Sequence, residues 1–312
     1  MELRTSVHIK EDLGRFQQGQ KILSLGSCFA ENIGSRLKLA GFDILINPLG
    51  NLFNPSVISE NIVSGINEIY DDALVVERDG SFFHFSCHSD IYGRTEADLK
   101  TLVLQRRQEM IDQLKQADHL ILTFGTAWVY RHLKSGSIVA NCHKIPQANF
   151  SKECLNLTDM FKSYQSLLSL LNQINPNLKV LLTVSPVRHI KNGLHENNLS
   201  KAQLLLLANE LAEKFDNISY FPAYELVLDD LRDYRFFEKD MIHPNELAVD
   251  YIYEKFKGAF FNERAIAIAR LYHKIMLLEG HRPRISNEQH QELQEKKLDQ
   301  LRANIDQLMN MS

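Results

Sequence analysis

The sequence predicts an α/β fold, a three-layer doubly wound parallel sheet of the flavodoxin-like type. Two observations lead to this prediction. Short apolar runs typical of buried strands alternate along the chain with longer amphipathic runs of helical period. Turn residues follow four of the apolar runs, at Gly26, Gly50, Gly125 and Pro186. Such alternation favours a parallel sheet that helices cover on both faces.

In chain order, five apolar segments are the predicted strands and five amphipathic segments are the predicted helices. The strands are expected over residues 22–25, 43–46, 119–124, 179–184 and 218–221. The helices are expected over residues 29–39, 56–69, 96–115, 160–174 and 197–215. Ligands of doubly wound sheets bind beyond the carboxyl ends of the strands. The turns that follow the strands are therefore expected to form one site.

Two insertions interrupt the alternation. Residues 73–77 and 81–86 flank turn residues 78–80, and residues 128–133 and 137–141 flank turn residues 134–136. Each pattern predicts a β-hairpin. Because both hairpins extend from loops that border the predicted site, they are expected either to form walls of a substrate pocket or to be structural additions.

The C-terminal part of the chain is predicted to be helical over residues 263–279 and 287–309, with Gly280–Arg284 between the two helices. We therefore expect an α/β catalytic domain over residues 1–261 and a helical extension over residues 262–312. The extension is expected to dock on the core or on a second copy of the chain, which would form a homo-oligomer.

Composition narrows the classes of function. The 312 residues are 44% hydrophobic and 24% charged, as in ordinary globular proteins. A formal net charge of −4 without a basic cluster argues against a nucleic-acid partner. No apolar run approaches a membrane span and the N-terminus lacks the apolar region of a signal peptide, so we expect a cytoplasmic protein unless another signal exports it. The four cysteines lack paired spacing, which predicts free thiols. No cofactor is expected.

Ser27 is the first candidate catalytic residue. An apolar run ends at Gly26-Ser27 and an amphipathic run follows at once, which predicts a buried strand, a tight turn and a helix. The hydroxyl would lie at the carboxyl edge of the sheet, beside free N–H groups and the positive end of the helix dipole. That environment suits a nucleophile, and it equally suits an N-cap serine.

Asp240 and His243 are the second candidate pair, three residues apart in a segment that precedes a predicted helix. Pro244 suits the first helical position and restricts His243 to an extended conformation. A carboxylate at this spacing can accept the Nδ1–H of the histidine and leave Nε2 free as a base. The alternative is a solvated loop with a helix cap.

These motifs resemble a known family. Residues 26–30 read Gly-Ser-Cys-Phe-Ala, the name motif of the GSCFA family, which resembles a branch of the SGNH/GDSL esterase superfamily. The resemblance spans roughly residues 20–285. It implies that Ser27 is the nucleophile, that His243 and Asp240 complete a triad, and that Gly50, within Asn47–Asn51, contributes to an oxyanion hole together with the N–H of Ser27.

The sequence departs from the superfamily pattern at the third block, Gly-x-Asn. Residues 123–128 keep Gly125 but place Ala127 in the asparagine position. Because loss of one oxyanion donor costs about 2.7–4 kcal/mol of transition-state stabilisation, another side chain is expected to take its place. Thr126 and Asn141 are the candidates. Asn141 is preferred because its amide donates without giving up an acceptor role.

Other residues have several interpretations. His143, Arg188, His189 and Trp128 are expected to line the substrate pocket or to be ordinary loop residues. A shift of the turn by one residue would make Cys28 the nucleophile of a Cys–His enzyme, although a small buried residue is the simpler interpretation. A metal site built from Cys142, His143, His189 and His243 lacks ligand-pair spacing, so no metal is expected.

The inferences together predict a serine hydrolase acting on small acyl esters, acetyl esters above all, of a small-molecule or carbohydrate alcohol. The carbohydrate is implied by the resemblance alone. One alternative is an O-acyltransferase of the same fold. A second is a non-catalytic protein that binds a carbohydrate or another ligand and has lost turnover. The missing asparagine favours that alternative, and the Ser27, His243 and Asp240 set favours the enzyme.

Overall fold

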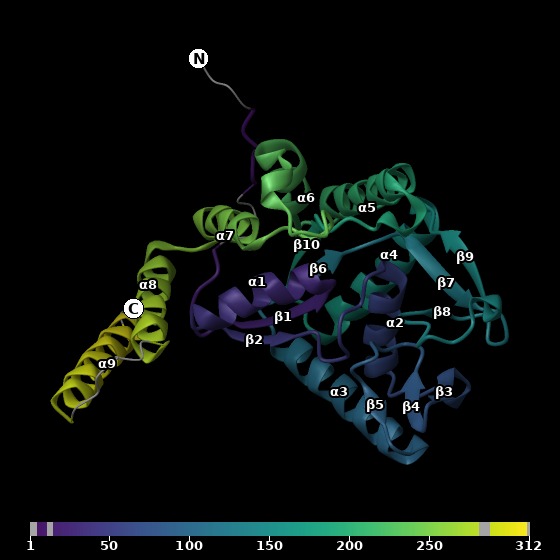
Figure 1. Cartoon of the computed structure of the whole chain (residues 1–312), viewed down its shortest axis with the longest axis horizontal. Coiled ribbons are helices and arrows are strands. Elements are labelled where there is room, and N and C mark those ends of the chain that lie inside the picture. Colours follow the sequence, from purple (N-terminus) through teal and green to yellow (C-terminus); the bar gives the residue numbers. More distant parts are fainter. Residues whose placement is uncertain (1–4, 11–14, 281–287, 311–312) are drawn as a thin grey trace.

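The computed structural model describes residues 5–10, 15–280 and 288–310. At its centre is a parallel sheet with the strand order β2-β1-β6-β10-β11 (Figure 1). Its strands coincide with the five predicted ones: β1 (Lys21–Gly26), β2 (Asp43–Ile46), β6 (His119–Phe124), β10 (Lys179–Val184) and β11 (Ile218–Phe221). Counted along the chain, this order is 2-1-3-4-5, and the direction of winding reverses between β1 and β6. The predicted doubly wound α/β class is confirmed.

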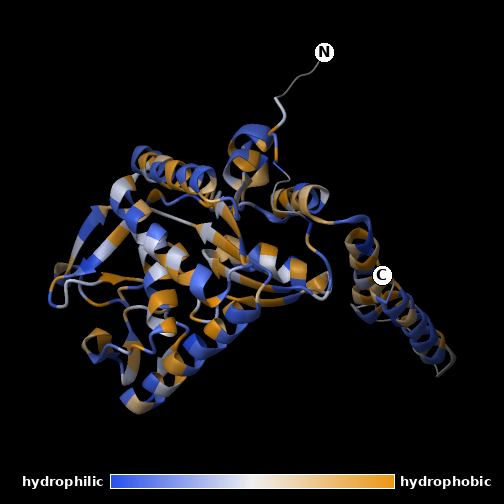
Figure 2. Ribbon diagram, turned by 180° about the vertical axis from the view of Figure 1, so that it is seen from behind, coloured by the Kyte–Doolittle hydropathy of each residue, from blue (hydrophilic) through white to orange (hydrophobic). Residues whose placement is uncertain are grey.

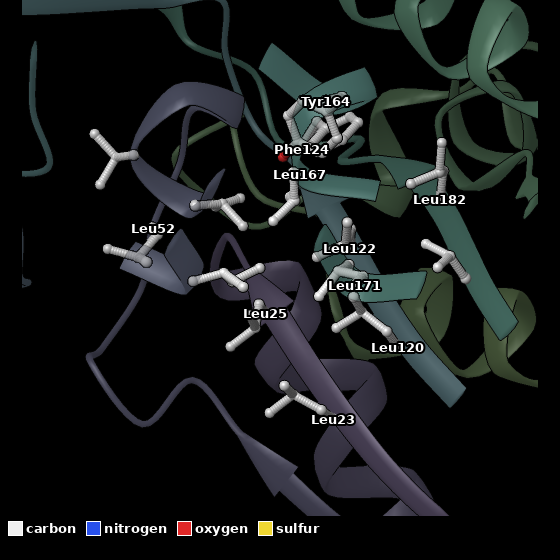
Figure 3. Packing of buried hydrophobic residues seen from close by; sticks show 14 of the residues in the cluster. Leu23, Leu25, Leu52, Leu120, Leu122, Phe124, Tyr164, Leu167, Leu171 and Leu182 are labelled. Carbon is white, nitrogen blue, oxygen red and sulfur yellow. The ribbon is translucent and has the colours of Figure 1, made fainter. Parts of the chain in front are cut away.

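Helices cover both faces of the sheet. One face packs against α1 (Cys28–Leu39) and α7 (Glu246–Phe260). The other packs against α2 (Pro55–Ile66), α3 (Glu96–Gln116), α4 (Leu157–Ile174) and α5 (Leu194–Lys214). Side chains alternate between the two cores because successive strand residues point to opposite faces: Leu120 and Leu122 belong to one cluster and Ile121 to the other. Figure 3 shows the larger cluster, in which Tyr164 and Leu167 of α4 meet strand leucines.

Both predicted hairpins are present, each within a three-stranded antiparallel sheet. The first contains β3 (Val75–Arg78), β4 (Ser81–His84) and β5 (Tyr92–Gly93). Its turn residues Asp79 and Gly80 have φ of 52° and 74°, the left-handed backbone of a tight two-residue turn. The second contains β7 (Trp128–His132), β8 (Ile138–Val139) and β9 (Phe150–Cys154). Strands β5 and β9 were not predicted.

The C-terminal helices α8 (Glu263–Gly280) and α9 (Glu288–Met309) form an arm that extends from the α/β body (Figure 1). Ile268, Ile275 and Ile305 are buried between the helices of the arm. These helices confirm the predicted ones, while residues 281–287, with most of the predicted connection, lie outside the described residues. The domain division at 261/262 and pairing of the arm with a second copy stay predictions.

Figure 2 shows hydrophobic residues concentrated in the strands of the central sheet and hydrophilic ones on the outer helix faces. Among the described residues, no helix is both long and apolar enough to cross a membrane. A short helix, α6 (Ala223–Glu225), continues into a π-helical segment (Leu226–Leu231) that covers the end of β11.

Candidate active site

The turn between β1 and α1 has the predicted conformation. Gly26 adopts φ +146°, and a Cβ placed on it would lie 2.3 Å from the carbonyl oxygen of Thr123 on β6. Only glycine permits this close approach of two strands. Ser27 then caps α1, and its Oγ accepts the N–H of Phe29 at 3.3 Å. The serine is therefore at the carboxyl edge of the sheet and at a helix N-terminus, with 1% of its surface exposed.

Two further turns meet at Ser27. The segment after β2 wraps around Gly26, whose N–H donates to Asn47 Oδ1 at 2.9 Å and whose carbonyl accepts the N–H of Leu52 at 2.8 Å. On the other side, a Cβ placed on Gly125 would lie 3.3 Å from the Cβ of Ser27. The turns after β1, β2 and β6 thus form one cluster, as the sequence predicts.

Asp240 and His243 form the predicted pair. His243 Nδ1 lies 2.7 Å from Asp240 Oδ2, and Asp240 Oδ1 accepts the N–H groups of Ile242 and His243 at 2.8 and 3.1 Å. These hydrogen bonds, that of the His243 side chain first, lower the pKa of Asp240 to about 2. The carboxyl is therefore ionised at neutral pH. Both side chains are about half exposed.

The pair lies at the same edge of the sheet as Ser27. The C-terminal end of α7 lies at the opposite, amino edge, where Phe16 bonds to Phe260 and stacks on His119 at the start of β6. The N-terminal end of α7, which His243 precedes, therefore lies at the carboxyl edge. Within the described chain no hydrogen bond joins Ser27 to His243, so their direct contact stays a prediction.

The backbone donors predicted for the oxyanion hole are engaged inside the protein. The N–H of Ser27 donates to Thr123 O at 3.2 Å, which continues the ladder between β1 and β6. The N–H of Gly50 donates to Asn47 O at 2.8 Å and closes a turn, in which Gly50 has φ +77°. Gly50 is near Gly26 through this loop, but in this structure neither N–H is free to bind an oxyanion.

The two side-chain candidates also have internal partners. Thr126 Oγ1 lies 3.1 Å from Ser200 Oγ and accepts the N–H of Trp128. Asn141 Oδ1 accepts the N–H of His143 at 2.8 Å. Thr126 follows Gly125 directly and so lies at the cluster of turns, whereas Asn141 stabilises the loop after β8.

His143 lies between the two hairpin sheets. Its side chain is fully buried, Nδ1 lies 3.1 Å from Ser89 Oγ, and Nε2 lies 3.0 Å from His84 O. Burial lowers its pKa to about 4 and keeps the ring neutral. With both nitrogens occupied and no exposed surface, His143 joins the two hairpin sheets and has no atom available to a substrate.

The other expected substrate-binding residues lie on the segments that follow β6 and β10. The indole N–H of Trp128 donates to Glu196 O at 3.2 Å. The backbone of Arg188 bonds to Ile242 O at 3.2 Å, and its guanidinium lies 4.2 Å from the ring centre of Phe237, which fastens the loop after β10 to the loop of His243. The backbone N–H of His189 donates to Asn197 Oδ1 at 2.8 Å.

Sequence reasoning missed Lys201. This residue of α5 is 1% exposed, and its Nζ donates to the carbonyl oxygens of Gly125 and Ser185, each at 2.6 Å. It thereby joins the ends of β6 and β10 beside the Ser27 turn. Burial lowers its pKa to about 7. A signal was present, because the buried stripe of α5 begins with three polar residues, Asn197, Ser200 and Lys201.

The alternatives based on cysteine and metal gain little support. Burial is the main cause of a raised pKa for the Cys28 thiol, which disfavours the thiolate that a cysteine nucleophile needs. The four cysteines are free thiols. In the described parts of the chain, no group of three or more His, Cys, Asp or Glu side chains is arranged to hold a metal ion.

Comparison of the sequence with known protein families identifies a match. The model of the GSCFA family matches residues 21–256, which include the cluster of turns, the pair of Asp240 and His243, and Lys201. No curated protein matches the sequence.

Proposed function

The chain belongs to the GSCFA family, and we propose that it is a serine hydrolase of the SGNH type that cleaves small acyl esters through an acyl-enzyme. Ser27 attacks the ester carbonyl, His243 Nε2 takes the serine proton and returns it to the leaving alcohol, and Asp240 holds the imidazole. The observation that carries this proposal is the 2.7 Å contact of Asp240 with His243 at the sheet edge where Ser27 caps α1.

The charge state of the pair supports these roles. Because the pKa of Asp240 is about 2, the carboxylate is available at neutral pH to accept Nδ1–H and to stabilise the imidazolium that forms during attack. Nε2 of His243 is then the base. A resting structure need not contain the hydrogen bond between nucleophile and base, since such bonds often tighten only when substrate is bound.

The oxyanion requires a donor other than the N–H groups of Ser27 and Gly50, which already donate inside the protein. The N–H of Cys28 contacts the thiol of its own residue and makes no hydrogen bond to another residue of the described chain. It lies in the first turn of α1, directly after the nucleophile. In other serine hydrolases the residue after the nucleophile supplies such a donor, and a helix N-terminus favours negative charge. We assign the first oxyanion contact to Cys28 N–H, with Thr126 as the nearest side-chain hydroxyl.

A second candidate function is binding without turnover. Ser27 is almost fully buried, it is not bonded to His243, and the N–H groups of Ser27 and Gly50 are satisfied internally. A protein that keeps the fold but only binds a ligand would need none of these groups to be free. The nature of the substrate, an acetyl ester of a carbohydrate-like alcohol, rests on the superfamily resemblance.

A fluorophosphonate probe that forms a covalent bond with activated serines separates the two candidates. The enzyme is expected to be labelled and to hydrolyse p-nitrophenyl acetate, with both activities lost in Ser27→Ala and Ser27→Gly. Two variants are needed because loss of the N-cap destabilises α1, by about 1 kcal/mol for alanine and by a few tenths for glycine. Ser35→Ala, on the exposed face of α1, is the control. Absence of labelling in the folded wild type would refute the hydrolase.

Product analysis separates hydrolase from O-acyltransferase. A hydrolase releases acid at a rate that is independent of added alcohol, whereas a transferase forms a new ester and turns over faster when an acceptor alcohol is supplied. Mass spectrometry of the wild-type products, with and without a sugar acceptor, shows whether acid or a new ester is formed. Ser27→Gly measures the uncatalysed reaction.

A further inference from the structure

A group of cations packs on two aromatic rings of β7, the strand that follows Gly125. We call it the lysine patch; it consists of Trp128 and Tyr130 on β7, Lys152 on β9, and His189 and Lys191 after β10. Lys152 Nζ lies 5.2 Å from the ring centre of Trp128 and 5.4 Å from that of Tyr130. Lys191 Nζ lies 5.3 Å from the same ring of Tyr130. Two ammonium groups therefore share one tyrosine ring.

No ion pair within the described residues neutralises the two lysines of the patch. Neither Lys152 nor Lys191 makes an ion pair with a carboxylate anywhere in the described ranges, and Lys152 donates to the neutral amide of Asn192. The neighbouring acidic residue Glu153 is already paired with Arg131. Cation–π contacts hold an ammonium in place without cancelling its charge. Both ammonium groups therefore lack an ion-pair partner in the part of the chain that the structure describes.

The imidazole ring of His189 is a further polar group of the patch. Its pKa is lowered, first by burial and then by repulsion from Lys152, Lys201 and Lys191, so that three cations act on one ring. Its Nε2 and the hydroxyl of Tyr130 are buried and have no hydrogen-bond partner among the described residues. Buried polar atoms are rarely left without a partner, and both of these can donate to an oxygen atom.

The patch is connected along the chain to the residues that surround Ser27. Trp128 is three residues from Gly125, which touches the Ser27 position, and His189 is four residues from Ser185, which Lys201 joins to Gly125. We propose that the lysine patch binds an oxyanion, a carboxylate or phosphate group, carried by the substrate. The assignment of that ligand to the substrate rests on the proposed function, whereas binding of the anion itself does not.

The test is a binding titration of the full-length protein that needs no turnover. Trp128 is the one tryptophan of the sequence, so tryptophan emission reports on the patch alone. Inorganic phosphate and citrate are titrated at constant ionic strength, and the thermal midpoint is followed as a second readout. Lys152→Met and Lys191→Met remove one charge each. Lys162→Met, at an exposed position of α4, is the matched control for loss of a lysine.

We expect a saturable change of Trp128 emission and a rise in thermal midpoint with at least one of the two anions. Affinity should fall about tenfold or more in Lys152→Met and Lys191→Met and stay unchanged in Lys162→Met, because a close charge pair is lost only in the first two. Preference for phosphate or for citrate identifies the anion. A response that is absent in the folded wild type, or equal in all three variants, overturns the proposal. Failure of Ser27 labelling with intact anion binding would overturn the hydrolase alone.

Discussion

The structure makes its sharpest prediction for the stability of the variant Lys201→Met. The Lys201 ammonium is buried beside the cluster of turns and donates to Gly125 O and Ser185 O. Burial disfavours the charged form and lowers the pKa of Lys201 from 10.5 to about 7. Methionine has a similar length and no charge. The comparison therefore isolates the effect of one buried, titrating amine on stability.

The sign of the pH dependence follows from the two pKa values. Below about pH 7 the amine is protonated in both the folded and the unfolded chain, and the full unfavourable cost of burying the charge applies. Between about pH 7 and 10.5 only the unfolded chain holds the proton, so the free energy of unfolding rises with pH. The slope is about 1.4 kcal/mol per pH unit, and the whole interval amounts to about 5 kcal/mol.

Urea denaturation of the wild type and Lys201→Met from about pH 7 to about pH 9 measures this difference. The free energy of unfolding of the wild type should gain about 2 kcal/mol relative to the variant over that range, because the slope reaches its full value only above the folded-state pKa. Groups that titrate in both proteins cancel in the comparison. Lys162→Met, which removes an exposed lysine, should follow the wild type. Parallel curves for the wild type and Lys201→Met would show that the amine is not buried with a lowered pKa.

Three further outcomes are expected. Asp240→Asn should lower kcat by about 10⁴-fold with little change in thermal midpoint, because the amide oxygen still accepts the loop N–H groups; a near-normal kcat would leave a dyad of Ser27 and His243. Three fully buried histidines have pKa values lowered from 6.5 to about 4, so urea denaturation should show stability falling as pH drops through this interval, by about 3 kcal/mol for each, and a flat profile would contradict their burial. Gly26→Ala should destabilise by more than about 2 kcal/mol in the same assay, because a Cβ meets Thr123 O, whereas Gly258→Ala in open space on α7 should be neutral or stabilising. The three buried histidines of the preceding pH prediction are His84, His119 and His143.

The strands of the sheet were predictable because they are buried on both faces. The run of residues 119–124 is mostly apolar and is followed at once by Gly125, so its limits agree with the structure. Helix starts were less accurate, since capping residues extend a helix beyond its apolar pattern. Helix α4 begins at Leu157 because Asn156 accepts the N–H of Asp159, three residues before the predicted start.

Strand β9 was missed for a physical reason. Its residues, Phe-Ser-Lys-Glu-Cys, contain no apolar run, and they form a strand only because β7 offers a partner edge. Arg131 of β7 and Glu153 of β9 form an ion pair across these strands. Pairing of this kind depends on a contact distant in sequence, which local periodicity does not contain.

The candidate site was predictable where its geometry is local. Asp240 and His243 are three residues apart, and the restriction that Pro244 imposes is also local, so their contact follows from the sequence. The state of the Ser27 N–H depends on a long-range partner. The N–H of Ser27 is occupied by Thr123, a residue nearly a hundred positions away, and no pattern around Ser27 indicates this.

The role of Lys201 was predictable in part, because one of its signals is local and its partners are distant in sequence. Helix α5 follows β10, so its first turns lie near the carboxyl edge of the sheet, where ligands of this fold class bind. The stripe that α5 buries has helical spacing, and polar residues occupy only its N-terminal end while leucines and an alanine fill the rest. A polar residue on the buried face of a helix must find partners inside the protein, and at this end of the helix the partners are the strand ends that form the site. The position of a polar interruption along a buried stripe is therefore itself evidence for a site residue.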